Sequence, residues 1–201
     1  MNYLKDIVKN QKSGIHAGCY SACTANKWVI EAVFEKAKEL NTCAVIEATA
    51  NQVNQFGGYT GMKPEDYKNM VFEIAEKVGF DKSKIILGGD HLGPLVWQKE
   101  DPDTAMEYSR QLIDGYIMAG YTKIHIDTSM RLSGDSLTEP LSDKVIAERS
   151  ADLYKQAKLS FENLKKQNPD AQAPVFIIGS EVPIPGGSGR GVPFAIFPPK
   201  W

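Results

Sequence analysis

The stretch IILGGDHLGP at residues 85–94 joins a short apolar run to two glycines, a carboxylate and an imidazole. Amphipathic helical patterns lie on both sides of it. The earlier pattern begins at Pro64 and stops at Gly79, and the later one spans residues 102–119 and stops at Gly120. A short apolar run between two helices predicts a buried strand of a parallel sheet. We place this strand at residues 85–89, with the polar residues directly after it.

The same alternation of strand and helix recurs along the chain. Apolar runs predict four more strands, at residues 14–19, 43–48, 124–127 and 175–179. Helical spacing predicts two more helices, at residues 26–40 behind an Asn26 cap and at residues 143–166. Because no hairpin signal is present, each strand must reach its neighbour through a crossover helix. The pattern therefore predicts an α/β fold.

Two α/β architectures share this alternation, the doubly wound sheet and the (β/α)₈ TIM barrel. The chain has no G-x-G-x-x-G after its first predicted strand and no G-x-x-x-x-G-K-[ST] anywhere, and both absences favour the barrel. A whole barrel usually takes about 250 residues or more. We therefore expect the N-terminal part of a TIM barrel, about five βα units.

The composition excludes several classes of protein. The 201 residues are 42% apolar and 24% charged, as in an ordinary globular domain. With 23 Lys and Arg against 25 Asp and Glu, the chain lacks the basic excess that binds nucleic acid or anionic membranes. No apolar run approaches the length of a membrane span, and the first ten residues lack a signal-peptide core. Three cysteines without C-x-x-C spacing predict a cytoplasmic protein.

A polar loop follows the second predicted strand. It begins at Glu47 and contains four side-chain amides, at Asn51, Gln52, Asn54 and Gln55. Active sites of both architectures lie at the carboxyl ends of the strands, and such a loop suits hydrogen bonds to a polyol or a phosphate. We predict that these five residues bind substrate. The alternative is a merely solvated loop.

Candidate catalytic groups follow the next three strands. Asp90 and His91 end the third, and strand alternation places His125 and Asp127 on one face after the fourth, with Ser129 beyond them. Glu181 follows the fifth, before a glycine pair that suits a phosphate. Histidine and carboxylates at one edge suit a divalent metal such as zinc, although structural roles are open for each. We expect His16 to be packed or hydrogen-bonded, and Cys19 and Cys23 to be small core or loop residues.

Five of these segments together resemble one protein family. They are CTAN (23–26), IEATANQVNQFGGYTGM (46–62), GGDHLGP (88–94), HIDTS (125–129) and EVPIPGG (181–187). They are similar to the GatZ/KbaZ family, the non-catalytic subunit of D-tagatose-1,6-bisphosphate aldolase. The resemblance covers about residues 1–188, and the second segment is long enough to make chance a poor explanation.

The resemblance implies a TIM barrel of the class II, zinc-dependent aldolase type. By similarity to the catalytic relatives, Asp90 would be the acid/base and His91 a metal ligand. Glu181 would lie near the metal. From their places after the strands, we predict that Asp127, Ser129, Gly186 and Gly187 bind substrate. The other histidine ligands of the relatives lie on later strands.

The chain departs from the family pattern in two ways. Family members are about twice as long, and the tail GRGVPFAIFPPKW after Ser188 carries no family pattern. We therefore expect a partial barrel over residues 1–188 and an atypical tail over residues 189–201, from a truncated or frame-shifted gene. Such a piece leaves two strand edges unpaired, which predicts poor solubility. Because it is only part of a barrel, we also expect no catalytic activity of its own.

The resemblance implies that the protein supports the activity and stability of a separate catalytic subunit in galactitol or N-acetylgalactosamine breakdown. A rival hypothesis is a metal-dependent 4-epimerase of tagatose, fructose or their 6-phosphates, which would use Asp90, His91 and Glu181. A third is a metal-free module that binds a sugar phosphate. Family members are also named tagatose-6-phosphate kinases, but the absence of a P-loop argues against kinase chemistry.

Overall fold

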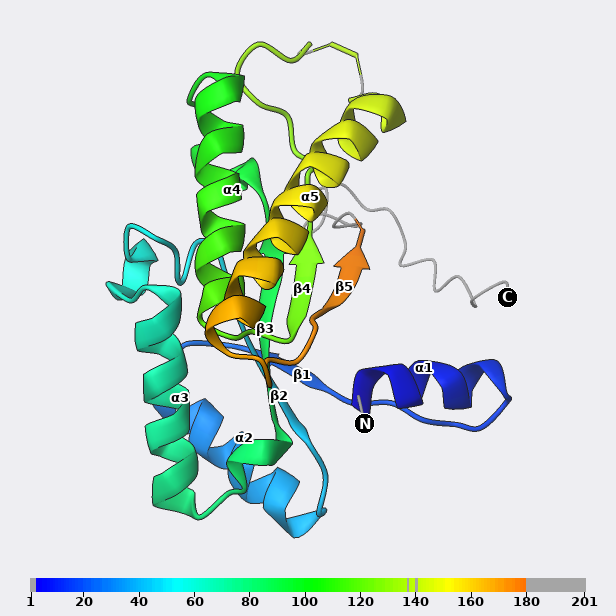
Figure 1. The fold of residues 1–201 in the computed structure, drawn as a ribbon, viewed down its shortest axis with the longest axis vertical. Helices are drawn as coiled ribbons and strands as arrows, with labels where there is room; N and C mark the ends of the chain where they lie inside the picture. Colours follow the sequence, from blue (N-terminus) through cyan, green and yellow to red (C-terminus); the bar gives the residue numbers. More distant parts are fainter. Residues whose placement is uncertain (1–2, 137, 140, 180–201) are drawn as a thin grey trace, which may run out of the picture.

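The computed structural model describes residues 3–136, 138–139 and 141–179. Five strands alternate with helices along the chain (Figure 1). The strands are β1 Ser21–Cys23, β2 Ala44–Thr49, β3 Ile85–Leu92, β4 Lys123–Ile126 and β5 Val175–Ile178. The helices are α1 Tyr3–Lys12, α2 Lys27–Glu39, α3 Pro64–Val78, α4 Pro102–Met118 and α5 Asp143–Gln167, with 3₁₀ turns η1 Gly58–Thr60, η2 Lys82–Lys84 and η3 Pro94–Trp97.

The strands form one sheet in the order β1-β2-β3-β4-β5, and every pairing is parallel. A doubly wound sheet reverses its order at a switch point, whereas a barrel adds each new strand next to the last. This sequential order is therefore that of a barrel. Among the described residues the sheet is unclosed, with β1 at one edge and β5 at the other. The structure confirms an α/β fold of five parallel strands, an open part of a barrel.

Two strands differ from the sequence prediction. The first was expected at residues 14–19, but the chain there is mostly exposed, and β1 begins only at Ser21. Gly14 has a left-handed φ of 75°, which interrupts an extended strand. The third was expected to end at residue 89, but β3 continues to Leu92. Helix α1 was not predicted, although Leu4, Ile7 and Val8 stand at helical spacing in its sequence, and none of its residues is buried.

The other helices begin and end close to the predicted residues. Asn26 caps α2, because its side chain accepts hydrogen bonds from the backbone N–H groups of Trp28 and Val29. Pro64 occupies the first turn of α3, and Gly79 ends that helix with φ at 70°. These local signals explain why the helices were predictable from the sequence.

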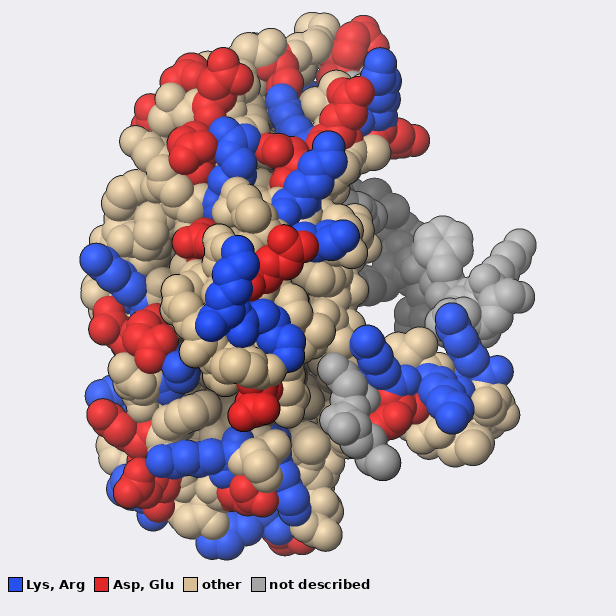
Figure 2. Space-filling model, in the orientation of Figure 1, with Lys and Arg blue, Asp and Glu red and all other residues tan. Residues whose placement is uncertain are grey.

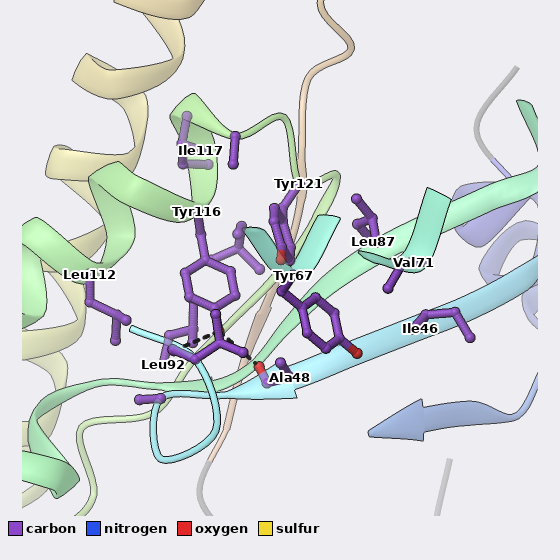
Figure 3. Packing of buried hydrophobic residues seen from close by; sticks show 14 of the residues in the cluster. Ile46, Ala48, Tyr67, Val71, Leu87, Leu92, Leu112, Tyr116, Ile117 and Tyr121 are labelled. Carbon is purple, nitrogen blue, oxygen red and sulfur yellow. Dashed lines mark hydrogen bonds between the residues drawn. The ribbon is translucent and has the colours of Figure 1, made fainter. Parts of the chain in front are cut away.

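Three buried tyrosines join the sheet to the helices (Figure 3). Tyr67 of α3 donates a hydrogen bond to the carbonyl of Glu47 at 2.9 Å, and Tyr116 of α4 donates to that of Val53 at 3.0 Å. Tyr121, just before β4, donates to the carbonyl of Pro64 at 3.0 Å. Their rings fill the core. The hydroxyls of Tyr67 and Tyr116 fix the chain around the carboxyl end of β2, where the polar loop begins, and that of Tyr121 fixes the start of α3.

Lysine, arginine and carboxylate side chains are interspersed over the face shown in Figure 2. This is the face on which α3, α4 and α5 lie in Figure 1. Neither sign of charge forms a continuous patch there, which agrees with the formal net charge of -2. None of the described helices combines the length and the apolar character needed to cross a membrane.

Candidate metal and sugar site

Strand alternation divides the sheet into two faces. On β2, the residues Ala44, Ile46 and Ala48 pack into the core with the helices. Glu47 therefore lies on the opposite side, which we call the inner face. The Glu47 side chain forms an ion pair there with Lys123 of β4. Both residues are buried, at 2% and 8% exposure.

A β-bulge interrupts the pairing of β3 with β4 just beyond this ion pair. Gly89 pairs with Ile124 and Leu92 pairs with Ile126, so two residues, Asp90 and His91, lie opposite the single residue His125. His91 takes a left-handed φ of 48°, which is uncommon for a residue with a side chain. Bulges of this kind re-aim side chains, and they are frequent beside functional sites.

The bulge brings one carboxylate and two imidazoles together. The Oδ1 atom of Asp90 lies 3.1 Å from Nδ1 of His125 and 3.2 Å from Nδ1 of His91. The two imidazole rings have centroids 4.2 Å apart. Asp90 therefore holds both rings through their Nδ1 atoms. The Nε2 atom of His125 is buried and has no hydrogen-bond partner among the described residues.

The electrostatics of the cluster keep Asp90 ionised. Burial alone would raise its pKa, but the hydrogen bond from His125 and the charges of His91 and Lys123 lower the pKa of this carboxyl well below its ordinary value. Cys23 lies nearby at the sheet edge. The protein packed around it and the Asp90 carboxylate raise the pKa of the Cys23 thiol to about 12. The thiol therefore stays protonated, and its Sγ lies 3.7 Å from Oε1 of Gln52.

Asp90, His91 and His125 fit a divalent metal ion. One ligand atom from each lies within 4.8 Å of the others. Metal-bound histidines usually donate their second ring N–H to a carboxylate, which is the arrangement that Asp90 makes. The unpartnered Nε2 of His125 has the chemistry of a zinc ligand. These three residues could hold a metal of the kind used by class II aldolases.

The sequence predicted His91 but not His125 as a ligand. His125 was predicted to share one face with Asp127, without a role as a ligand. One sequence signal could have identified both Lys123 and His125: they are polar residues at alternate positions of a buried strand. The predicted ligand Glu181 and the predicted substrate residues Gly186 and Gly187 lie outside the described residues. His16 was expected to be packed or hydrogen-bonded, but it is exposed, because residues 14–19 do not form a strand.

The amides of the predicted substrate loop make many internal contacts. Asn54 donates to the carbonyl of Ala50, and its Oδ1 accepts from the backbone N–H groups of Phe56 and Gly58. Gln52 accepts from the backbone N–H of Thr49, and Gln55 donates to the carbonyl of Tyr108. These bonds fix the shape of the loop.

Asn51 is the exposed amide of the loop. It lines a cavity of about 300 Å³ beside the metal cluster. The lining residues are Thr49, Ala50, Asn51, Asp90, His91, Leu95 and Val96. A carboxylate, an imidazole and an amide thus meet at one cavity at the carboxyl end of β3.

Asp127 and Ser129 form a turn directly after β4. The Asp127 carboxylate accepts hydrogen bonds from the backbone N–H and the hydroxyl of Ser129, at 2.9 and 2.6 Å. Gly93 packs against this turn, since a Cβ added there would lie 1.8 Å from the Asp127 carbonyl oxygen. The turn therefore needs glycine at position 93, and it fixes the end of β4 against the end of β3.

Comparisons with known proteins agree with this architecture. The chain is 44% identical over 189 residues to the D-tagatose-1,6-bisphosphate aldolase subunits GatZ of Shigella flexneri serotype 5b (strain 8401) and Escherichia coli O1:K1 / APEC. The matches cover 94% of this chain and 43% of each relative. The chain therefore spans less than half the length of these relatives.

A solved structure is similar as well. It is described as the crystal structure of a probable tagatose 6 phosphate kinase from Sinorhizobium meliloti 1021, with 44% identity and a TM-score of 0.72 over 82% of this chain and 39% of that chain. The profile of the family described as D-tagatose-1,6-bisphosphate aldolase subunit GatZ/KbaZ-like matches residues 4–192. Because this match takes in nearly the whole chain, the protein belongs to the GatZ/KbaZ-like family of D-tagatose-1,6-bisphosphate aldolase subunits.

Proposed function

We propose that the chain acts as a non-catalytic subunit of a D-tagatose-1,6-bisphosphate aldolase, which supports the activity and stability of a separate class II catalytic subunit. The observation that carries this proposal is the 44% identity to GatZ subunits over 94% of the chain. The names of these relatives favour a subunit over the 4-epimerase alternative. The three cysteines are unpaired, which supports a reducing, cytoplasmic location.

The proposal includes a zinc-type metal held by His91 and His125. A bound divalent metal would supply a Lewis acid that polarises the carbonyl group of a ketose. Asp90 accepts from Nδ1 of both imidazoles and so orients their Nε2 atoms. The acid/base role of Asp90 belongs to the 4-epimerase alternative, in which the ionised carboxylate would begin by accepting a proton. Glu181 is proposed as a further ligand.

The cavity beside Asn51 supports a sugar-phosphate ligand. Its volume of about 300 Å³ lies at the lower end of the range for small-molecule sites. Asn51 and Asp90 offer hydrogen-bonding groups to sugar hydroxyls. We propose Gly186 and Gly187 as contacts for a phosphate. Further polar residues would surround this site and fix the loops that form it: Glu47, Gln52, Asn54, Gln55, Asp127 and Ser129.

The test is a mixing experiment with the catalytic class II subunit. Cleavage of D-tagatose-1,6-bisphosphate and the melting temperature of the catalytic subunit are measured with and without equimolar amounts of this chain. Serum albumin at the same concentration is the control for nonspecific protection. We expect both quantities to rise only with this chain, and no change in either would contradict the proposal. Metal-dependent interconversion of tagatose and fructose by the chain alone would favour the epimerase instead.

A further inference from the structure

The ion pair of Glu47 and Lys123 lies on the inner face beside the metal cluster, and the metal ligands do not account for it. Charged groups are seldom buried unless they are paired, because removing them from water is costly. The side chains of Lys123 and Glu47 are only 10% and 3% exposed. Apolar residues could fill this space at lower cost, so the retention of two charges here calls for an explanation.

Gly88 provides the space in which the pair forms. It is the register partner of Glu47 on one side and of Lys123 on the other. The two side chains therefore reach each other above a residue that has none. A Cβ added at Gly88 would lie 2.4 Å from Oε1 of Glu47 and 2.7 Å from its Cγ. Any side chain at position 88 would displace the carboxylate that holds Lys123.

Lys123 also faces the metal cluster. Its Nζ atom lies 3.9 Å from Oδ1 of Asp90, the same oxygen that contacts Nδ1 of His91 and His125. At this distance the ammonium group acts on the oxygen through its charge and not through a hydrogen bond. Its attraction, added to the two histidine contacts, favours one orientation of the carboxylate.

We propose that Lys123 is a positioning residue for the metal centre, fixed by Glu47 above Gly88 so that its ammonium group directs Asp90 onto the two histidines. This inference rests on the proposed function, because it assumes that His91 and His125 bind a metal. A protonated ammonium group has no lone pair for a metal, so Lys123 acts through Asp90. The orientation of the Nε2 atoms, and hence zinc affinity, depends on it.

The test is zinc affinity, measured on the full chain by competition with a chromophoric chelator. The double variant Glu47→Gln/Lys123→Met removes both charges, so that no unpaired charge is left buried. We expect it to bind zinc more weakly, by up to about 10-fold, the lower end of the loss that is typical when the direct outer partner of a metal ligand is removed. Lys144→Met, which removes an exposed lysine of α5, is the matched control and should bind as the natural chain does.

Thermal melting separates positioning from a merely structural role. If the ion pair has only a structural role, its loss in the double variant lowers the melting temperature. Zinc affinity, measured well below that temperature, then stays unchanged. Equal affinity of the double variant and the natural chain therefore overturns the inference and leaves the metal proposal intact. Failure of the natural chain to bind zinc overturns both. Lys123→Arg keeps the charge, and we expect it to bind more tightly than the double variant; equally weak binding also overturns the inference.

Discussion

Asp90 and His125 are joined by a contact of 3.1 Å between Oδ1 and Nδ1, although they come from different strands and lie 35 residues apart in the chain. The register of β3 and β4 leads to this contact, because Gly88 pairs with Lys123 and Gly89 with Ile124, which places Asp90 opposite His125. The bulge then adds His91 opposite the same residue, so the sequence neighbours Asp90 and His91 both face one imidazole. The consequences for metal binding, stability and assembly can be measured.

Zinc is expected to stabilise the natural chain. A ligand that binds only the folded state at 100 times its dissociation constant adds about 2.7 kcal/mol to the free energy of unfolding. His125→Ala removes one of the proposed ligands, so zinc should no longer raise its melting temperature. His16→Ala removes an exposed histidine outside the cluster and should respond to zinc as the natural chain does. Equal zinc responses in all three proteins would contradict the metal site.

Gly88→Ala is expected to destabilise the fold by about 1–3 kcal/mol, because its Cβ would overlap the buried Glu47 side chain. Unfolding in urea measures the loss. Gly115→Ala is the matched control, since a Cβ in this position of α4 has its nearest neighbour, Cγ of Pro64, at 3.5 Å. Alanine is the better helix former, so the control should be neutral or more stable by up to about 1 kcal/mol. Similar losses in both variants would refute the close packing above Gly88.

Asn26→Ala is expected to cost about 1 kcal/mol, because the backbone N–H groups of Trp28 and Val29 lose the side chain that caps them. Asn69→Ala, at an exposed position inside α3, should cost nothing and can add a few tenths of a kcal/mol. The comparison of the two free energies of unfolding isolates the cap from the general effect of removing an asparagine.

Acid should weaken the contact between Asp135 and Arg149, which joins the loop after β4 to α5 at 2.8 Å. The hydrogen bonds from Arg149 lower the pKa of the Asp135 carboxyl below its ordinary value of 3.8. A lowered pKa in the folded state contributes stability above pH 3.8, and that contribution is lost as the pH falls through the folded value.

Asp135→Asn should therefore cost about 1.5–3 kcal/mol at pH 7, the range for a hydrogen bond to a charged group. The difference from the natural chain should narrow below pH 3.8. Urea unfolding between pH 3 and 7 measures this. Glu148→Gln, at an exposed position of α5, should differ little from the natural chain at pH 7. If the difference in the free energy of unfolding between Asp135→Asn and the natural chain stays constant with pH, the carboxylate is not the stabilising group.

The open edge at β5 is expected to cause self-association. Ile177 and Ile178 of this strand are 39% and 65% exposed, and the strand has one sheet neighbour among the described residues. Exposed apolar edge strands favour aggregation, and charge on the edge opposes it. Ile178→Lys should therefore raise solubility and lower the sedimentation coefficient at high concentration. A monodisperse monomer of the natural chain would refute this expectation.

Much of the fold could be predicted from the sequence because its signals are local. The Asn26 cap, Pro64 in the first turn of α3 and the stop at Gly79 act within a few residues, and the structure confirms them. The first strand was misplaced because residues 14–19 have the composition of a strand but no partner to pair with. The N-terminal helix was missed although Leu4, Ile7 and Val8 carry the helical spacing, because only one short apolar stripe marks its ten residues.

The site was less predictable because a β-bulge breaks the strand alternation and leaves no periodic pattern in the sequence. Strand alternation places Asp90 and His91 on opposite faces, whereas the extra residue in β3 brings both to His125. Lys123 was overlooked for a similar reason. Its importance depends on a glycine in the neighbouring strand and a glutamate in the strand beyond, which only the register reveals.

The sequential order of the sheet also determines how the protein can fold. Within the part of the chain that the structure describes, each strand pairs only with the strands that directly precede and follow it in the sequence. Every pairing among the described strands then closes a loop of one βα unit. Each strand finds its pairing partner in the unit directly before it. Parallel pairing is slow to form, but a pairing that skips no unit closes a shorter loop than one that does, and domains generally fold from the amino terminus during synthesis. The five units can therefore be added one at a time from the amino terminus, each on the template of the strand before it.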